Sequence, residues 1–143
     1  MKKLKIKIVV ADYYKEITNP LIQSCIETLE QSKLKYETLT VPGVYEIPIA
    51  IRKNIKKFNG FVALGCVIRG QTPHFDLICS STFSSILNLS IAFNKPIGNG
   101  IITANNIIQA RQRCKNTDKK KPNKGLEAAK AVMSILENGP KKI

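Results

Sequence analysis

The stretch GCVIRGQTPHFD, residues 65–76, marks the point where a buried strand passes into a long helix. Residues 61–68 are almost continuously apolar, which is typical of a parallel strand covered on both faces. Over residues 75–93, apolar side chains recur at helical spacing. Thr72 and Pro73 fit an N-cap and a first helical position, because the hydroxyl accepts a hydrogen bond from the first turn and proline has no N–H to leave unpaired. We therefore expect the helix to begin directly after this pair.

The same junction has the properties of an anion site. Free backbone N–H groups around Gln71 to His74 would add to the positive end of the helix dipole, a combination that binds phosphate. His74 is the only histidine of the chain, and imidazole is the side chain that exchanges protons most readily near neutral pH. The glycines also have P-loop spacing, but Gln71 stands where a P-loop has its phosphate-binding lysine, so a nucleotide triphosphatase is not expected.

Strand and helix patterns alternate four times along the chain. This order predicts a parallel sheet with helices on both sides, a three-layer α/β/α sandwich of the flavodoxin-like type with a central four-stranded sheet. We expect a single domain over residues 1–143. The expected strands are residues 4–11, 35–41, 61–68 and 97–103, and the expected helices start at Asn19-Pro20, near Ile47, at about His74, after a cap at Asn105, and at about Gly125.

Ligands of such sheets bind outside the carboxyl ends of the strands. Tyr13, Glu46 and His74 each lie in a segment that follows a predicted strand, so we expect them to converge on one edge. Gly98 and Gly100 interrupt the last strand, which indicates that something approaches its backbone closely.

The composition is strongly basic, with 23 Lys and Arg against 10 Asp and Glu and a net charge of +13. This excess suits either nucleic acid or small anionic substrates. The lysines are scattered apart from a run at residues 119–121, and no basic helix occurs, so we expect no nucleic acid; a basic binding module is the alternative. Four widely spaced cysteines indicate free thiols in a cytoplasmic protein, and no segment is expected to span a membrane.

Four motifs together resemble those of the lumazine synthase family of riboflavin biosynthesis. They are PGVYEIP at residues 42–48, the stretch at residues 65–76, Gln109-Ala110 with Arg113, and Asn123-Lys124-Gly125. The resemblance implies a transferase that condenses 5-amino-6-(D-ribitylamino)uracil with 3,4-dihydroxy-2-butanone 4-phosphate to give 6,7-dimethyl-8-ribityllumazine, phosphate and water. It implies neither a metal nor an organic cofactor. It also implies a homo-oligomer, a pentamer or a pentamer-based assembly, with sites between subunits.

Carried over onto this sequence, the resemblance gives the pyrimidine several contacts. Tyr13 would stack on the ring, and Lys124 would meet its carbonyl side. Glu46 would hold the ribityl chain together with the backbone of Val44 and Tyr45. The other substrate-binding residues on this side are Cys66, Val67 and Ile68.

The remaining implied roles concern phosphate and proton transfer. The backbone N–H groups of Gln71 and Thr72 would bind phosphate, and His74 would transfer protons. Arg113 would bind phosphate from the neighbouring subunit. Asn99, also from the neighbouring subunit, stands where many members have an aromatic side chain, so its contact with the substrate would be through backbone or amide.

Overall fold

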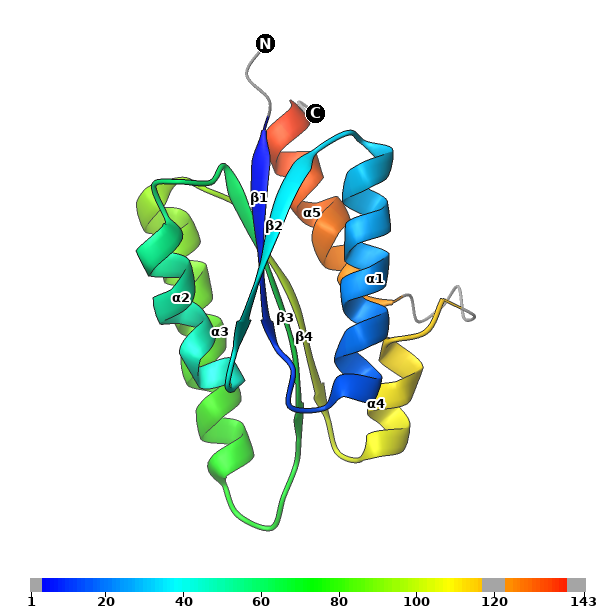
Figure 1. Cartoon of the computed structure of the whole chain (residues 1–143). Helices are drawn as coiled ribbons and strands as arrows, with labels where there is room; N and C mark the ends of the chain where they lie inside the picture. Colours follow the sequence, from blue (N-terminus) through cyan, green and yellow to red (C-terminus); the bar gives the residue numbers. More distant parts are fainter. Residues whose placement is uncertain (1–3, 117–122, 139–143) are drawn as a thin grey trace, which may run out of the picture.

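The computed structural model of the chain describes residues 4–116 and 123–138, so the lysine run at residues 119–121 lies outside the described residues. Four parallel strands form one sheet in the order β2-β1-β3-β4. α2 and α3 cover one face of the sheet, and α1, α4 and α5 cover the other (Figure 1). The predicted three-layer α/β/α sandwich is confirmed. The elements are β1 Lys5–Ala11, α1 Lys15–Gln31, β2 Lys35–Val41, the 3-10 turn η1 Val44–Glu46, α2 Ile47–Asn54, β3 Gly60–Ile68, α3 His74–Phe93, β4 Ile97–Ala104, α4 Ile107–Arg113 and α5 Lys124–Asn138.

The central strands β1 and β3 are buried on both faces, which explains their unbroken apolar sequences. Successive residues alternate between two cores: Ile8 packs beneath α1 and α5, and Val9 packs beneath α2 and α3. Each fully buried Ile or Leu contributes about 1.5–3 kcal/mol from removal of its apolar surface from water. The two cores therefore fix the sheet, and with it the carboxyl edge where the loops gather.

The first helix begins earlier than the sequence predicted. α1 starts at Lys15 rather than at Asn19-Pro20, and Pro20 lies inside it. The backbone N–H groups of Ile17 and Thr18 both donate to Tyr14 O at 2.9 Å, and Ile17 is completely buried. Burial of this extra turn outweighs the one helical hydrogen bond that proline cannot make. The predicted loop at residues 11–18 is consequently only three residues long.

The capping predictions were each wrong by one residue. Pro73, not Thr72, is the N-cap of α3, although the Thr72 hydroxyl still accepts from the His74 N–H at 3.4 Å. Asn106, not Asn105, caps α4, and its side chain accepts from the Gln109 N–H at 2.9 Å. Asn105 is thereby left for a different contact, described below.

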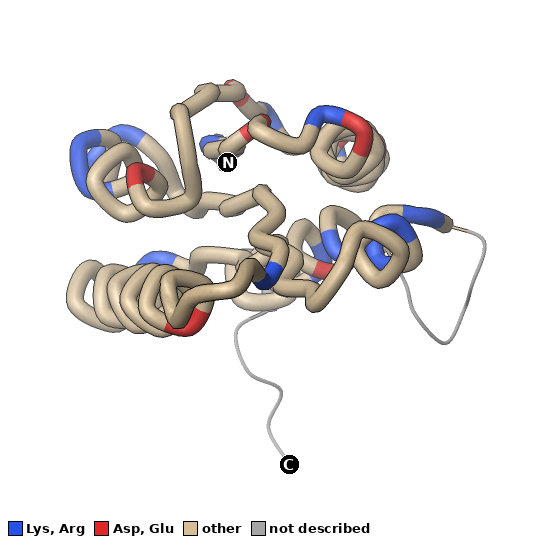
Figure 2. The backbone as a smooth tube through the Cα atoms, turned by 90° about the horizontal axis from the view of Figure 1, so that it is seen from below, with Lys and Arg blue, Asp and Glu red and all other residues tan. Residues whose placement is uncertain are grey.

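α3 is long and apolar enough to cross a membrane by length and composition, a property that sequence analysis assigned to no segment. Of the described residues, His74–Phe93 alone meets that test by length and composition. Its sheet-facing side buries Phe75, Thr82 and Ile86. Leu77, Leu87 and Ile91, by contrast, are 65%, 60% and 70% exposed. Figure 2 shows charged residues over α1, α2 and α4, whereas α3 is almost without them.

The close approach predicted at the β4 glycines is made by the last helix at Gly98 and most tightly by β3 at Gly100. A Cβ on Gly98 would lie 2.3 Å from Ala128 O of α5, and one on Gly100 would lie 2.6 Å from Leu64 Cδ2. Only glycine permits this spacing. Gly125 at the start of α5 has the same relation to α1, since its Cβ would lie 2.2 Å from Leu21 O. These contacts set the position of Lys124, the first residue of α5.

Candidate active site

A cavity of about 410 Å³ opens at the carboxyl ends of β1 and β3. It unites side chains that are more than sixty residues apart in sequence, among them Tyr13 after β1 and His74 at the start of α3, as the sequence predicted. We call it the stacking cavity. Its lining residues are Ala11, Tyr13, Tyr14, Pro42, Gly43, Val44, Tyr45, Cys66, Val67, Ile68, His74 and Ile78.

Two neighbouring tyrosines form one wall of the stacking cavity. Tyr13 is 78% exposed, so the face of its ring is available to a ligand. Tyr14 is only partly exposed and meets Tyr13 edge to face, with 4.9 Å between ring centroids. Burial and the neighbouring Tyr13 raise the pKa of Tyr14, so its phenol stays neutral. Sequence analysis assigned no role to Tyr14, although it adjoins Tyr13 and stands where many members of the family have Asn.

The turn η1 packs closely against β3 because Gly65 has no side chain. A Cβ on Gly65 would lie 2.7 Å from Val44 Cγ1, so any larger residue in β3 would push η1 outward. Tyr45 lines the stacking cavity, but Glu46 borders an adjoining cavity of about 380 Å³ between α2 and α3. The Glu46 carboxylate lies near Gly43, where a Cβ would be 3.2 Å from Oε1. Glu46 is thus beside the stacking cavity rather than in its lining.

Cys66 lines the stacking cavity but is not suited to act as a nucleophile. It is 6% exposed, and burial raises the pKa of its thiol to about 12, with a smaller contribution from Cys114. A thiol held neutral in this way is inert as a nucleophile near neutral pH. Together with Val67 and Ile68 it gives the floor of the cavity an apolar surface against which a flat ring can lie.

The predicted anion site adjoins the stacking cavity through His74, which lines it. Gln71, Thr72 and His74 are all exposed. Among the described residues, the backbone N–H groups of Gln71 and Thr72 donate no backbone hydrogen bond outside regular elements. These N–H groups and the start of a twenty-residue helix are available to an anion.

Three other predicted residues, Asn99, Arg113 and Lys124, lie elsewhere. They line a separate cavity of about 210 Å³ along the outer edge of β4, which we call the edge cavity. Arg113 also lines an adjoining cavity with Gln109, its neighbour in the sequence motif, and with Gln112 and Thr103, which sequence analysis did not connect with a site. Within the described part of the chain, Arg113 forms no ion pair. One chain therefore carries two separate groups of predicted site residues.

Asn123 fixes Lys124 at the edge cavity. Its buried side chain accepts from the N–H groups of Gly125 at 2.8 Å and Leu126 at 3.1 Å, and donates to Cys114 O at 2.8 Å. This cap ties the end of α4 to the start of α5. Lys124 itself pairs with Glu127 one turn later at 3.3 Å.

Comparison with known families decides the relationship of the chain. The model of one family, described as 6,7-dimethyl-8-ribityllumazine synthase, matches residues 3–138. The chain belongs to this family. A 6,7-dimethyl-8-ribityllumazine synthase of Bartonella henselae is 41% identical over 139 residues, which are 94% of this chain and 88% of that protein. The enzyme of the same name from Bartonella tribocorum is 39% identical, covering 94% and 89%.

The likeness to the 6,7-dimethyl-8-ribityllumazine synthase family extends beyond one genus. A protein of that name from Limosilactobacillus reuteri is 36% identical over 139 residues, covering 95% of this chain and 90% of that protein. Among solved structures, a de novo designed Rossmann-fold protein aligns with a TM-score of 0.39 at 14% identity, covering 76% of this chain and 90% of that chain. The family resemblance seen in the four sequence motifs is confirmed.

Proposed function

We propose that this protein condenses 5-amino-6-(D-ribitylamino)uracil with 3,4-dihydroxy-2-butanone 4-phosphate, releasing phosphate and water. The observation that carries this proposal is the stacking cavity, lined by both Tyr13 and His74 in a member of the 6,7-dimethyl-8-ribityllumazine synthase family. The reaction needs a flat heterocycle to be held, a phosphate to be bound and protons to be moved. The chain carries a side chain or backbone group suited to each of these tasks.

The pyrimidine would lie on the Tyr13 ring, with Cys66, Val67 and Ile68 beneath it. A cavity lined by an exposed aromatic ring and by apolar side chains favours a planar ligand. The ribityl chain would extend toward Val44 and Tyr45. Glu46, beside the cavity, would accept hydrogen bonds from its hydroxyl groups.

The phosphate of the second substrate would bind to the N–H groups of Gln71 and Thr72 at the positive end of α3. His74 would carry protons during imine formation, phosphate loss and ring closure. Holding two substrates in one orientation supplies much of the acceleration of such a condensation, so few reactive groups are required.

Arg113, Asn99 and Lys124 would complete the site of an adjacent subunit. They gather in the edge cavity, outside the stacking cavity, which supports a site shared between chains. The exposed apolar residues Leu77, Leu87 and Ile91 of α3 support burial of this helix in an assembly. We propose a pentamer or a pentamer-based assembly of single-domain subunits in the cytoplasm.

The activity assay follows lumazine absorbance or fluorescence after the purified protein is mixed with both substrates. We expect product that depends on both of them. Absence of product at high protein concentration would contradict the proposed reaction and favour a basic binding module.

The assembly assay is light scattering coupled to gel filtration. We expect a mass of at least five chains of 15.9 kDa. A monomer that forms product would contradict the shared site.

A further inference from the structure

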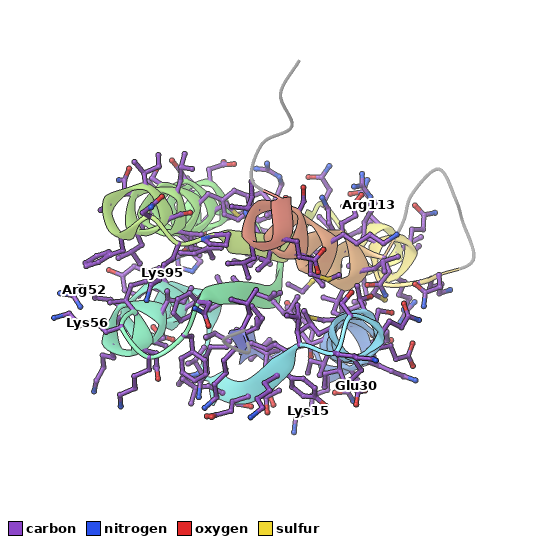
Figure 3. All side chains as sticks on the ribbon, turned by 90° about the horizontal axis from the view of Figure 1, so that it is seen from above. Lys15, Glu30, Arg52, Lys56, Lys95 and Arg113 are labelled. Carbon is purple, nitrogen blue, oxygen red and sulfur yellow. The ribbon has the colours of Figure 1, made fainter. Side chains whose placement is uncertain are left out.

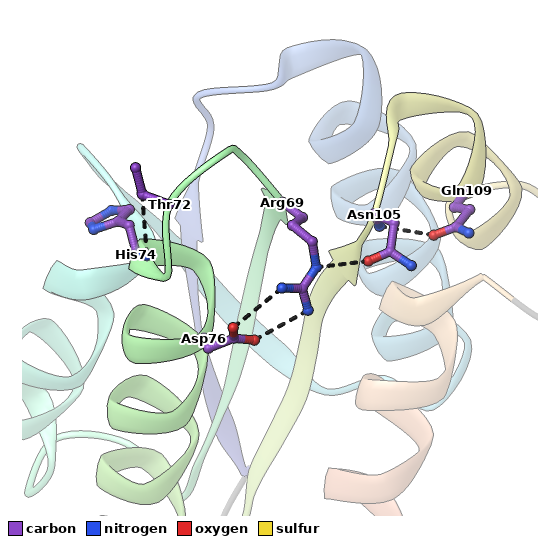
Figure 4. Close-up of polar contacts among 6 residues, drawn as sticks. All are labelled: Arg69, Thr72, His74, Asp76, Asn105 and Gln109. Carbon is purple, nitrogen blue, oxygen red and sulfur yellow. Dashed lines mark hydrogen bonds and ion pairs between the residues drawn. The ribbon is translucent and has the colours of Figure 1, made fainter.

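The side chain of Arg69 connects the two groups of site residues within one chain. Arg69 is the residue directly after β3, and its guanidinium makes a two-pronged ion pair with Asp76 of α3, at 3.2 Å for both Nη1 to Oδ2 and Nη2 to Oδ1. Its Nε donates to Asn105 Oδ1 at 3.0 Å (Figure 4). All five N–H donors of an arginine lie in one plane, which allows one guanidinium to reach both partners.

The bond to Asp76 closes a short loop. Residues 70–73 are exposed, and a Cβ on Gly70 would meet no atom within 4 Å, so packing does little to fix this segment. It contains Gln71 and Thr72, whose N–H groups are the proposed phosphate donors. Arg69 and Asp76 join its two ends, and the guanidinium also lies over the buried Phe75 ring, 4.5 Å from the centroid.

The hydrogen bond from Arg69 to Asn105 connects the anion loop, residues 70–74, to the second group of site residues, near α4. The Asn105 N–H donates to Gln109 Oε1 at 2.8 Å, and the Gln109 N–H donates to the Asn106 cap at 2.9 Å. Gln109 lines the same cavity as Arg113, one turn further along α4. The backbone N–H of Arg69 adds a bond to Ala104 O at 2.9 Å. The position of α4 is therefore linked to that of the anion loop.

We propose that Arg69 is a positioning residue that holds the anion loop, residues 70–74, and the start of α4 in the geometry that binds the phosphate-bearing substrate. This inference rests on the proposed function. The competing explanation is that Arg69 acts as one more positive charge that attracts phosphate. The two explanations differ in the sign of the effect expected at Asp76.

Kinetics of three variants separate the explanations. Arg69→Ala should raise the KM for butanone phosphate about tenfold and change the KM for the pyrimidine less than about twofold. The reason is that displacement of the loop weakens only the binding of the substrate whose phosphate it holds. Asp76→Asn should also raise the butanone-phosphate KM, since it leaves the loop untied, although it removes a negative charge near the phosphate. Arg69→Lys keeps the charge but loses the fork, so it should fail to restore the KM.

A second measurement reads the loop without any substrate. Hydrogen–deuterium exchange should speed up in peptides covering residues 69–77 and 104–113 of Arg69→Ala, with the rest of the chain unchanged. Arg52→Ala is the matched control: it removes the same charge and a similar contact, a guanidinium 4.7 Å from the Phe93 centroid, at the other end of the molecule. The control should leave both peptides and the butanone-phosphate KM unchanged.

Several results would overturn the proposal. A lower butanone-phosphate KM in Asp76→Asn, or full restoration by Arg69→Lys, would assign Arg69 to simple attraction. Unchanged exchange in Arg69→Ala would show that the loop does not depend on it. If the unmodified protein forms no lumazine, the proposed function fails, while the exchange measurement still tests whether Arg69 holds the loop.

Discussion

The two ends of the sheet use their polar side chains differently. At the amino end the side chains contact one another: Lys5 and Lys7 both pair with Glu37, and both ammonium groups lie about 5 Å from the Phe58 ring centroid. On the α2 side of the same end, Lys95 donates to Ile55 O at 2.5 Å (Figure 3). These charged groups already have interaction partners within the folded chain.

At the carboxyl end some side chains also pair, such as Arg69 with Asp76, but several of the predicted site residues have no such partner. Tyr13 and Tyr45 are 78% and 65% exposed, His74 is exposed, and Arg113 has no ion-pair partner among the described residues. Groups that cost the fold little when they are removed are free to bind a ligand. We therefore expect changes at the carboxyl end to alter catalysis and changes at the amino end to alter stability.

The largest effect is expected at Arg113. Arg113→Ala should raise the KM for butanone phosphate about 100-fold, because charge-assisted hydrogen bonds contribute about 1.5–3 kcal/mol, and should leave the pyrimidine KM nearly unchanged. Steady-state kinetics with each substrate varied in turn would measure this. Arg111→Ala is the control on the same helix, since Arg111 pairs with Glu16 of α1. Equal effects on both substrates would contradict a phosphate role for Arg113.

A smaller effect is expected at Gly65, where fold and site meet. Gly65→Ala should lower the kcat/KM for the pyrimidine about tenfold and cost about 1–3 kcal/mol of unfolding free energy, because the new methyl group displaces Val44 and the η1 turn. Val44→Ala in the same chain should restore part of both losses by making room. Kinetics and denaturant unfolding of the single and double variants measure the coupling. Fully additive losses would show that the two residues do not compete for space.

Cys66 offers a pH test of the stacking cavity. Because burial raises the pKa of this thiol to about 12, its thiolate fraction should keep rising about tenfold per pH unit above pH 9, where an exposed thiol levels off. Peptide-resolved iodoacetamide labelling between pH 7 and about 10.5 measures this. The same labelling in unfolded protein is the control. A native-state rate that levels off near pH 9 would mean that the thiol is open to solvent.

The smallest effect is expected at the amino end. The side-chain hydrogen bond from Lys5, with a smaller one from Lys7, lowers the pKa of Glu37. This carboxylate therefore contributes stability above its ordinary titration range and loses that contribution as the pH falls through its lowered pKa. Glu37→Gln should make unfolding slightly less sensitive to acid and leave both KM values unchanged. A change in either KM would break the division between the two ends.

The sequence predicted the layers, the parallel sheet and most element boundaries because burial dictates them. The continuous apolar run of β3 requires a strand covered on both faces, and the apolar stripe of α3 requires a helix packed on the sheet. The start of α1 was predicted too late because Asn19-Pro20 is a typical helix start in the local sequence. The burial of Ile17, which favours the earlier start, depends on tertiary packing. Local signals also assigned the caps one residue away from their true positions.

The candidate site was less predictable than the fold. Tyr13 and His74 were expected together because both follow strands. The separation of Lys124 from Tyr13 depends on how α5 packs on α1 and β4 through contacts at Gly98 and Gly125, and no local pattern names the partners in those contacts. Arg69 was not singled out at all, since its partners Asp76 and Asn105 become neighbours only after the loops have met.

The separation of the stacking cavity from the edge cavity has a consequence for mixtures of chains. Each complete site would take the stacking cavity from one chain and the edge cavity from its neighbour. A His74→Ala chain would then keep an intact edge cavity, and an Arg113→Ala chain would keep an intact stacking cavity. In a randomly co-assembled, equal mixture, about a quarter of the contacts would then join two intact halves. Two impaired proteins would then give a mixture more active than either alone, and the activity recovered would measure the fraction of subunit contacts that join two intact halves.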